Sequence, residues 1–185
     1  MGKKTILVIC NGNIHRSAIA ERCLARAIQQ RGLGEEFLVL SRGLQGTGGT
    51  ALPRHFNLRD YPLEWKLSEP VLDKLGIDLS GHVAKPVSEY NVAESSIILA
   101  MDRKTLIYQP NSLVVQFPAY GFKMRLFREL EGKTEDVPDC AESDNPDLHE
   151  HVIGLINRVS QNYVEVLIEY ACLFTATTTK GECLE

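Results

Sequence analysis

The sequence lacks the long apolar run that a helix needs to cross a membrane. Such a helix takes roughly 20 consecutive apolar residues, whereas the apolar runs here have the length of a strand, as at residues 6–10. The charged start at Lys3 and Lys4 leads into an apolar stretch that stops at Asn11, too soon for a secretion signal. We therefore expect a cytoplasmic protein with no membrane partner.

Paired cysteines are also missing. The five cysteines are an odd number, and no two of them have Cys-x-x-Cys spacing. We therefore expect reduced thiols rather than a disulfide framework or a zinc motif. The useful question is whether one of these thiols is a nucleophile. The five are Cys10, Cys23, Cys140, Cys172 and Cys183.

The chain has no excess of positive charge. Its formal net charge is -4 at pH 7, which argues against nucleic acid as a partner because a phosphate backbone attracts basic surfaces. Hydrophobic residues make up 44% of the 185 residues, enough for one sizeable core. We expect one domain over residues 1–174, followed by a polar tail over residues 175–185.

Predicted strands alternate with predicted helices along the chain. This alternation favours an α/β fold with one parallel sheet and helices on both faces. Ligands of such sheets bind at the carboxyl ends of the strands, which here is the loop after the first strand. The segment 43–64 is rich in glycine and proline and is predicted to be irregular. Strands are predicted over 5–10, 37–40, 97–101 and 113–117, and helices over 17–31, 68–75, 103–108, 124–131 and 145–174.

The loop over residues 10–17, here called the anion loop, has the sequence Cys-Asn-Gly-Asn-Ile-His-Arg-Ser. The free N–H groups and the dipole of the following helix favour a bound anion. Gly12 lets the chain curl, Asn13 tolerates a left-handed backbone, and the Arg16 fork matches two phosphate oxygens. The predicted phosphate-binding residues are Asn11, Gly12, Asn13, Ile14, His15 and Arg16.

The same positive field makes Cys10 a candidate nucleophile. A thiol beside a helix N-terminus and a guanidinium is readily converted to the thiolate, which attacks phosphorus. Ser17 could donate a further hydrogen bond to the sulfur. A cysteine at a strand end is often only a small core residue, and its spacing to Arg16 alone is weak support. The order strand, Cys, Gly-containing loop, Arg-Ser and helix favours the catalytic interpretation.

The anion loop resembles the signature Cys-x-Gly-Asn-Ile-x-Arg-Ser of the low-molecular-weight protein tyrosine phosphatases. Further similarities follow in the family's order at residues 41–43, 76–82, 100–102 and 137–139, so that the resemblance covers about residues 5–172. It implies a flavodoxin-like, four-stranded parallel sheet and hydrolysis of phosphomonoesters, most simply phosphotyrosine, through a phosphocysteine at Cys10. It also implies that neither a metal nor a cofactor is required.

A proton donor for the leaving oxygen is expected in the acid segment, residues 135–144. The resemblance of Val-Pro-Asp at 137–139 to the family's acid-bearing stretch singles out Asp139, with Asp136 or Asp144 as alternatives. Family members usually carry Pro and then an aromatic residue after this Asp, whereas here Cys140 and Ala141 follow. The full set of candidates is Glu135, Asp136, Asp139, Glu142 and Asp144.

Two departures bear on regulation and substrate. His15 occupies a position where family members often have a protective second cysteine, so we expect no disulfide within the loop and easy over-oxidation of Cys10. We interpret His15 as a loop-face residue rather than a catalytic base. The apolar Ile14 resembles the tyrosine-directed members, since arginine-phosphate-directed relatives carry a smaller polar residue there. Candidates for an aromatic rim of the pocket are Phe56, Tyr61 and Trp65.

Two other functions stay open from the sequence. An arsenate reductase of the same fold would need relay cysteines near residues 85–95, where there are none. A non-catalytic module that binds phosphate or a phosphoprotein would not need the full set of Cys10, Arg16 and Ser17. The expected partners are a phosphorylated protein or a small aryl phosphate, with inorganic phosphate or a similar oxyanion in the loop.

Overall fold

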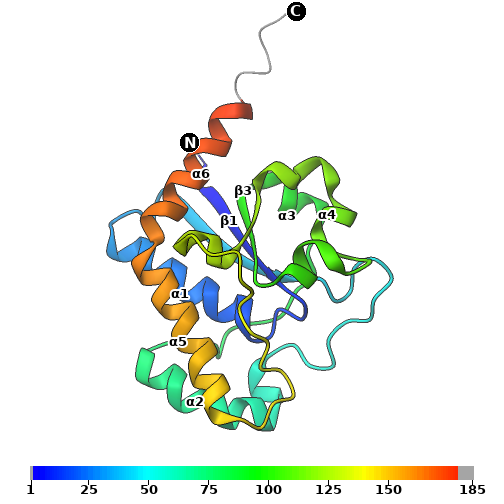
Figure 1. Cartoon of the computed structure of the whole chain (residues 1–185). Helices are drawn as coiled ribbons and strands as arrows, with labels where there is room; N and C mark the ends of the chain where they lie inside the picture. Colours follow the sequence, from blue (N-terminus) through cyan, green and yellow to red (C-terminus); the bar gives the residue numbers. More distant parts are fainter. Residues whose placement is uncertain (1, 179–185) are drawn as a thin grey trace, which may run out of the picture.

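The computed structural model describes residues 2–178 and contains a parallel sheet of four strands in the order β2-β1-β3-β4 (Figure 1). The central strand β1 pairs with β2 on one side and β3 on the other, so the strand order reverses beside it. This confirms the predicted α/β fold. The strands are β1 (Lys4–Cys10), β2 (Phe37–Gly43), β3 (Ser95–Ala100) and β4 (Met124–Leu126).

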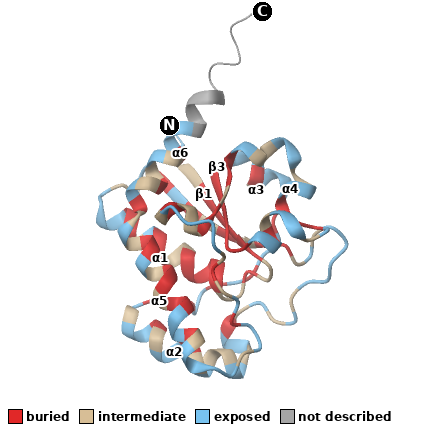
Figure 2. Cartoon of the chain, viewed as in Figure 1, coloured by how far each residue is buried: buried red, intermediate tan, exposed pale blue. Residues whose placement is uncertain are grey.

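The strands are apolar because the sheet is covered on both faces. Along β1, Ile6 and Val8 enter one core cluster, and Leu7 and Ile9 enter the other, as the period of two requires. Figure 2 shows the buried strands between the two helical layers. One layer holds α1 (Arg16–Gln30), α5 (Pro146–Asn162) and α6 (Val164–Thr178); the other holds α3 (Glu89–Glu94) and α4 (Leu113–Gln116).

The fourth strand lies elsewhere than predicted. Of residues 113–117, predicted as a strand, the first four form α4, in which Leu113 is buried while Val115 is 58% exposed. The strand is β4, where buried Met124 and Leu126 flank Arg125. The predicted helix over 124–131 is therefore wrong at its start, and its remainder is the 3₁₀ helix η4 (Phe127–Glu131). A strand of three residues gives too little alternation to recognise in a sequence.

The second predicted helix also begins earlier than its sequence suggests. The helix α2 spans Pro62–Leu75, so Pro62 lies in its first turn and Pro70 lies inside it. The prediction of a start at Ser68 is wrong because it placed Pro70 in the first turn, where proline is most readily accepted. The irregular segment is correspondingly shorter and contains the 3₁₀ helix η1 (Leu58–Asp60). Two further short elements are η2 (Lys104–Tyr108) and η3 (Pro118–Lys123).

The predicted last helix is two helices. Asn145 caps α5 by accepting a hydrogen bond from the backbone N–H of Asp147, as its position predicts. The helix ends at Asn162, and α6 begins at Val164 and extends past the predicted boundary at residue 174. The final part of the predicted tail lies outside the described residues. Among residues 2–178, no helix combines the length and apolar character needed to cross a bilayer.

Candidate active site

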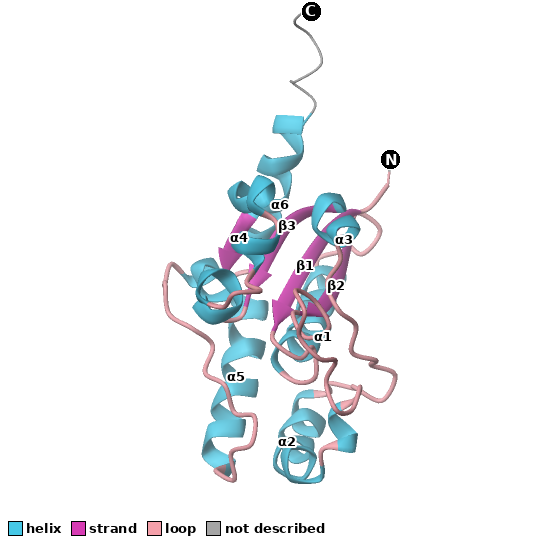
Figure 3. Cartoon of the chain, turned by 90° about the vertical axis from the view of Figure 1, so that its right-hand side faces the viewer, coloured by secondary structure: helices cyan, strands magenta, loops and turns pink. Residues whose placement is uncertain are grey.

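The anion loop lies where the strand order reverses. Cys10 ends β1, Arg16 begins α1, and the neighbouring strands β2 and β3 end beside them. Figure 3 shows the loops that gather at this edge of the sheet. The geometry is that expected for a ligand site in an open parallel sheet.

Two hydrogen-bond donors converge on the buried sulfur of Cys10. The backbone N–H of Asn13 donates to Sγ at 3.2 Å, and Oγ of Ser17 lies 3.0 Å from the same sulfur. Ser17 Oγ already accepts from Nδ2 of Asn13 at 3.0 Å, so its own O–H can be directed to the sulfur. Hydrogen bonds of this kind stabilise an anionic acceptor. The predicted contact between Ser17 and Cys10 is therefore present.

Asn13 holds the curvature of the anion loop. Its φ of 56° is left-handed, as predicted for this position. Its buried amide donates to Ser17 and to Oγ of Ser41 at 2.8 Å, and its Oδ1 accepts from the N–H of Lys85 at 3.0 Å. Nε2 of His82 lies 2.7 Å from its carbonyl oxygen. The side chain and backbone of one residue thus tie the loop to two other segments.

The Ser-Arg-Gly stretch at residues 41–43 contacts the anion loop and supports its shape. Oε2 of Glu21 accepts hydrogen bonds from the N–H and the hydroxyl of Ser41, at 2.8 and 2.5 Å, which orients Ser41 toward Asn13. Gly43 packs directly on the loop backbone, since a Cβ there would lie 2.9 Å from the carbonyl oxygen of Asn11. Ser41 and Gly43 were motif positions without a predicted role, and together with Glu21 they shape the loop.

The guanidinium of Arg16 bridges three acceptors. Nη1 donates to Oδ2 of Asp102 at 2.6 Å and to the carbonyl of Val137 at 3.0 Å, and Nη2 donates to Oδ2 of Asp139 at 2.8 Å. Burial alone would lower the pKa of Arg16, but the negative charges of Cys10, Asp139 and Asp102 outweigh it and raise the pKa. Arg16 is therefore a permanent cation beside Cys10.

Asp102, at the end of β3, had no predicted role. Burial alone would raise the pKa of its carboxyl, but Arg16 and hydrogen bonds from Thr105 overcome this and hold the pKa below its ordinary value. The backbone N–H of Thr105 donates to Oδ1 at 2.7 Å. Asp102 is thus a fixed carboxylate that orients Arg16. Its only sequence signal was the Ala-Met-Asp stretch at 100–102.

Within the acid segment, Asp139 is the carboxylate that reaches Arg16. Its side chain is 58% exposed, so it faces both the guanidinium and solvent. Asp136 is engaged elsewhere, because it accepts from the backbone N–H and Nε of Arg103 at 2.9 and 3.1 Å. Glu135 pairs with Arg128. The geometry favours Asp139 over Asp136 as the proton donor.

The side chain of His15 lies beside the acid segment and the helices α2 and α5. Nε2 lies 3.0 Å from Oγ of Ser68, and Nδ1 lies 3.6 Å from Sγ of Cys140. Burial, followed by the nearby charges of His149 and Arg16, lowers the pKa of His15 to about 3. Burial raises the pKa of Cys140 to about 12, with Asp139 adding to the effect. Both side chains are neutral at neutral pH.

The three candidate rim residues have different surroundings. Phe56 is 42% exposed, whereas Trp65 packs against the main core and carries the guanidinium of Arg59 over its ring at 4.9 Å. The hydroxyl of Tyr61 binds the backbone of His55. Trp65 and Tyr61 therefore stabilise the start of α2, and Phe56 is the rim candidate with a free face.

The fold and the anion loop define a phosphatase of the α/β class with a cysteine in its anion site. The sequence matches the low molecular weight phosphotyrosine protein phosphatase family over residues 5–171, and the chain belongs to that family. The predicted resemblance is thereby confirmed.

Curated relatives match most of the chain. It is 29% identical over 164 residues to the low molecular weight protein-tyrosine-phosphatase Etp of Escherichia coli, covering 88% of this chain and 94% of Etp. The probable phosphatase AmsI of Erwinia amylovora is 27% identical over 164 residues, with coverages of 88% and 96%.

Solved structures share the fold. The low molecular weight protein tyrosine phosphatase of T. tengcongensis superposes with a TM-score of 0.66 at 25% identity, covering 90% of this chain and 99% of that one. YwlE of Bacillus subtilis superposes with a TM-score of 0.68 at 22% identity, with coverages of 90% and 99%. At 22% identity, the similarity to YwlE shows a shared fold and nothing more.

Proposed function

We propose that the protein is a protein tyrosine phosphatase that hydrolyses phosphomonoesters through a phosphocysteine at Cys10. The observation that carries this proposal is the convergence on one loop of a sulfur with two hydrogen-bond donors and a guanidinium fixed by Asp102. The family match supports the same reaction class.

In the first step the substrate phosphate enters the anion loop. Backbone N–H groups of residues 11–15 and the Arg16 guanidinium bind its equatorial oxygens and stabilise their charge in the transition state. The Cys10 thiolate attacks phosphorus in line, so that the S–P bond forms as the bond to the leaving oxygen breaks. Asp139 donates a proton to that oxygen, which leaves as an alcohol or phenol.

In the second step water hydrolyses the phosphocysteine. Asp139, now a carboxylate, accepts a proton from the water as its oxygen attacks phosphorus, and the Cys10 thiolate leaves. Ser17 stabilises the departing sulfur anion through the contact at 3.0 Å. Neither step uses a metal or a cofactor.

The ion pair between Arg16 and Asp139 has to open before the reaction can begin. Nη2 of Arg16 engages Oδ2 of Asp139 at 2.8 Å, yet a proton donor must be free to face the leaving oxygen. An incoming phosphate dianion competes for the same Nη2 donor and releases Asp139. The released carboxyl can then turn toward the leaving oxygen of the bound substrate. Substrate binding thus prepares its own acid.

The substrate class follows from the surroundings of the loop. Ile14 is partly buried and packs against the main core, which leaves an apolar wall for a phenyl ring beside the phosphate. We therefore assign phosphotyrosine in a protein, or a small aryl phosphate, as the substrate. The cysteines of residues 2–178 are all free thiols, which fits work in the reducing cytoplasm.

A substrate panel tests this function. Reduced wild-type protein and Cys10→Ser are incubated in EDTA with matched peptides that carry phosphotyrosine, phosphoserine or phosphoarginine. We expect phosphate release from the phosphotyrosine peptide by wild type alone, and trapping of a labelled phosphocysteine after acid quench. Phosphate binding without turnover would favour a binding module, and thioredoxin-coupled arsenate reduction without turnover would favour a reductase.

A further inference from the structure

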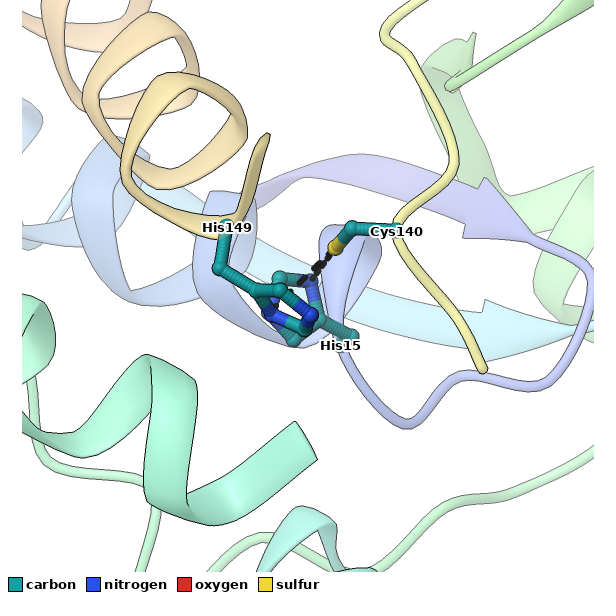
Figure 4. Close-up of side chains that lie close together, drawn as sticks. All are labelled: His15, Cys140 and His149. Carbon is teal, nitrogen blue, oxygen red and sulfur yellow. Dashed lines mark hydrogen bonds between the residues drawn. The ribbon is translucent and has the colours of Figure 1, made fainter. Parts of the chain in front are cut away.

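Three metal-binding side chains lie together beside the anion loop. His15 comes from the loop itself, Cys140 follows Asp139, and His149 lies in the first turn of α5 (Figure 4). One ligand atom from each residue lies within 4.8 Å of the others. Cys140 and His149 are buried and His15 is partly buried. These three residues are called the ligand cluster below.

The hydrogen bonds around the cluster indicate which ring nitrogens are available to bind a metal. Nε2 of His149 lies 3.0 Å from the carbonyl of Ser143, which can only accept, so Nε2 carries a hydrogen and the nitrogen that could bind a metal is Nδ1. Nδ1 lies 3.1 Å from Oγ of Ser68, which can donate its single hydrogen there. Ser68 can then accept from Nε2 of His15 at 3.0 Å, which leaves Nδ1 as the ring nitrogen free for a metal once the ring turns, since Sγ of Cys140 lies 3.6 Å from Nδ1 and 3.8 Å from Nε2.

The cluster therefore offers two imidazole rings and one thiol. Two imidazole nitrogens and a thiolate suit Zn²⁺ and related late transition metals, which prefer four tetrahedral ligands. Ligand atoms in such a site lie about 3.5 Å apart for metal bonds of about 2.0–2.3 Å. A contraction of roughly 1 Å through side-chain rotation would complete it, while the bond from His149 to Ser143 orients the ring as metal-bound histidines require.

We propose that His15, Cys140 and His149 bind Zn²⁺ as an inhibitory site, with Ser68 or water as the fourth ligand. When the metal binds, Cys140 releases its proton to solvent and its thiolate forms the metal–sulfur bond. The site would join the residue before Arg16 to the residue after Asp139. It would thus hold Asp139 against Arg16 and oppose the release that phosphate brings about. The binding stands by itself, and the inhibition rests on the proposed function.

Cobalt provides a direct test of binding. Co²⁺ is titrated into reduced, metal-free Cys10→Ser protein, in which the loop thiolate cannot compete. We expect one equivalent to bind, with thiolate-to-cobalt charge-transfer absorption and the visible bands of a tetrahedral ion, both lost when Zn²⁺ displaces it. Cys10→Ser/Cys140→Ala should lose the charge-transfer band, and Cys10→Ser/Cys172→Ser, altered at an exposed cysteine on α6, should keep it.

Circular dichroism of each variant separates loss of the site from loss of the fold. Retention of the band in the Cys140→Ala protein, or absence of stoichiometric binding in folded Cys10→Ser, would overturn the site. His149→Asn keeps a smaller polar side chain without the imidazole nitrogen and should weaken Co²⁺ binding about tenfold or more. Unchanged binding in that variant would also overturn it.

A kinetic arm tests the inhibition in protein with an intact Cys10. The zinc concentration that halves aryl phosphate hydrolysis should rise about tenfold or more in Cys140→Ala, and stay constant in Cys172→Ser. If the cobalt site is present but zinc inhibits wild type and Cys140→Ala equally, the coupling to Asp139 is wrong. If wild type has no phosphatase activity, the proposed function fails while the cobalt result still decides the site.

Discussion

The carboxylate of Asp102 lies 2.6 Å from Nη1 of Arg16, and both side chains are almost fully buried. Asp102 follows β3, and Arg16 begins α1, so this pair connects the ends of two adjacent strand–helix units. A buried carboxylate without its cation would be strongly unfavourable. The pair therefore fixes the guanidinium in one orientation, with Nη2 left for an exchangeable partner.

Asp102→Asn should destabilise the fold, because it removes the buried anion that pairs with the Arg16 guanidinium and leaves only the more exposed Asp139. We expect the free energy of unfolding to fall by about 3 kcal/mol and kcat/KM for an aryl phosphate to fall with it. Urea denaturation measures the first quantity. Asp136→Asn is the matched control, since its more exposed partnership with Arg103 should cost about 1 kcal/mol or less. Equal losses in both variants would contradict the positioning role.

Asp139→Asn removes the proposed proton donor and keeps the shape of the side chain. We expect kcat to fall by about 10²–10⁴-fold for phosphotyrosine peptides, and by less for aryl phosphates whose leaving group needs no proton. Inorganic phosphate should bind at least as tightly, because Arg16 loses a competing carboxylate. Steady-state kinetics and phosphate inhibition measure both effects. A similar kcat loss in Asp136→Asn would move the acid role away from Asp139.

Asn13→Ala and Asn13→Gly separate the backbone of this residue from its side chain. Both lose the side-chain bonds to Ser17, Ser41 and Lys85, but only alanine is strained at a φ of 56°. We expect Asn13→Ala to be less stable than Asn13→Gly by about 1–2 kcal/mol. Thermal unfolding of the two variants provides the comparison. Equal stability would mean that the loop relaxes to another conformation.

Acid should destabilise the protein through His15. Its folded pKa of about 3 lies below the ordinary 6.5, so in this interval the unfolded chain binds the extra proton. The stabilisation is therefore complete above pH 6.5 and is lost as the pH falls. Between pH 6 and 4 the loss should approach about 1.4 kcal/mol per pH unit.

Urea denaturation across pH checks this slope. His15→Gln should flatten it, whereas His151→Gln, at an exposed position of α5, should leave it unchanged. His82 contributes in the same direction, because burial lowers its pKa as well. A wild-type slope that His15→Gln does not alter would show that His15 keeps its ordinary titration in the folded protein.

The anion loop could be predicted because its chemistry is local. Cys10, Arg16 and Ser17 lie within eight consecutive residues, and strand and helix patterns on either side fix their setting. The roles of Asp102, Ser41 and Gly43 could not be predicted, since each depends on which strand ends become neighbours. A motif marks such residues without saying what they touch.

Other sequence predictions were wrong or missing for different physical reasons. Residues 113–117 have the β-branched composition of a strand, but their position outside the sheet makes them a helix with exposed valines. The spacing rules for zinc motifs could not reveal the ligand cluster, because its members meet only through folding. His15 and Cys140 are 125 positions apart along the chain, and Cys140 and His149 are nine apart. The predicted boundary between domain and tail stays a prediction.

The support of the anion loop also determines when it can form during synthesis. The loop lies near the start of the chain, yet its shape depends on Ser41, His82 and Lys85, and its arginine depends on Asp102. A ribosome-bound chain that ends before these residues contains Cys10 but lacks the residues that shape the anion loop around it. Competence should therefore arise only after the chain has been synthesised past residue 102 and these segments have docked, and a shorter chain would carry a cysteine without phosphate specificity.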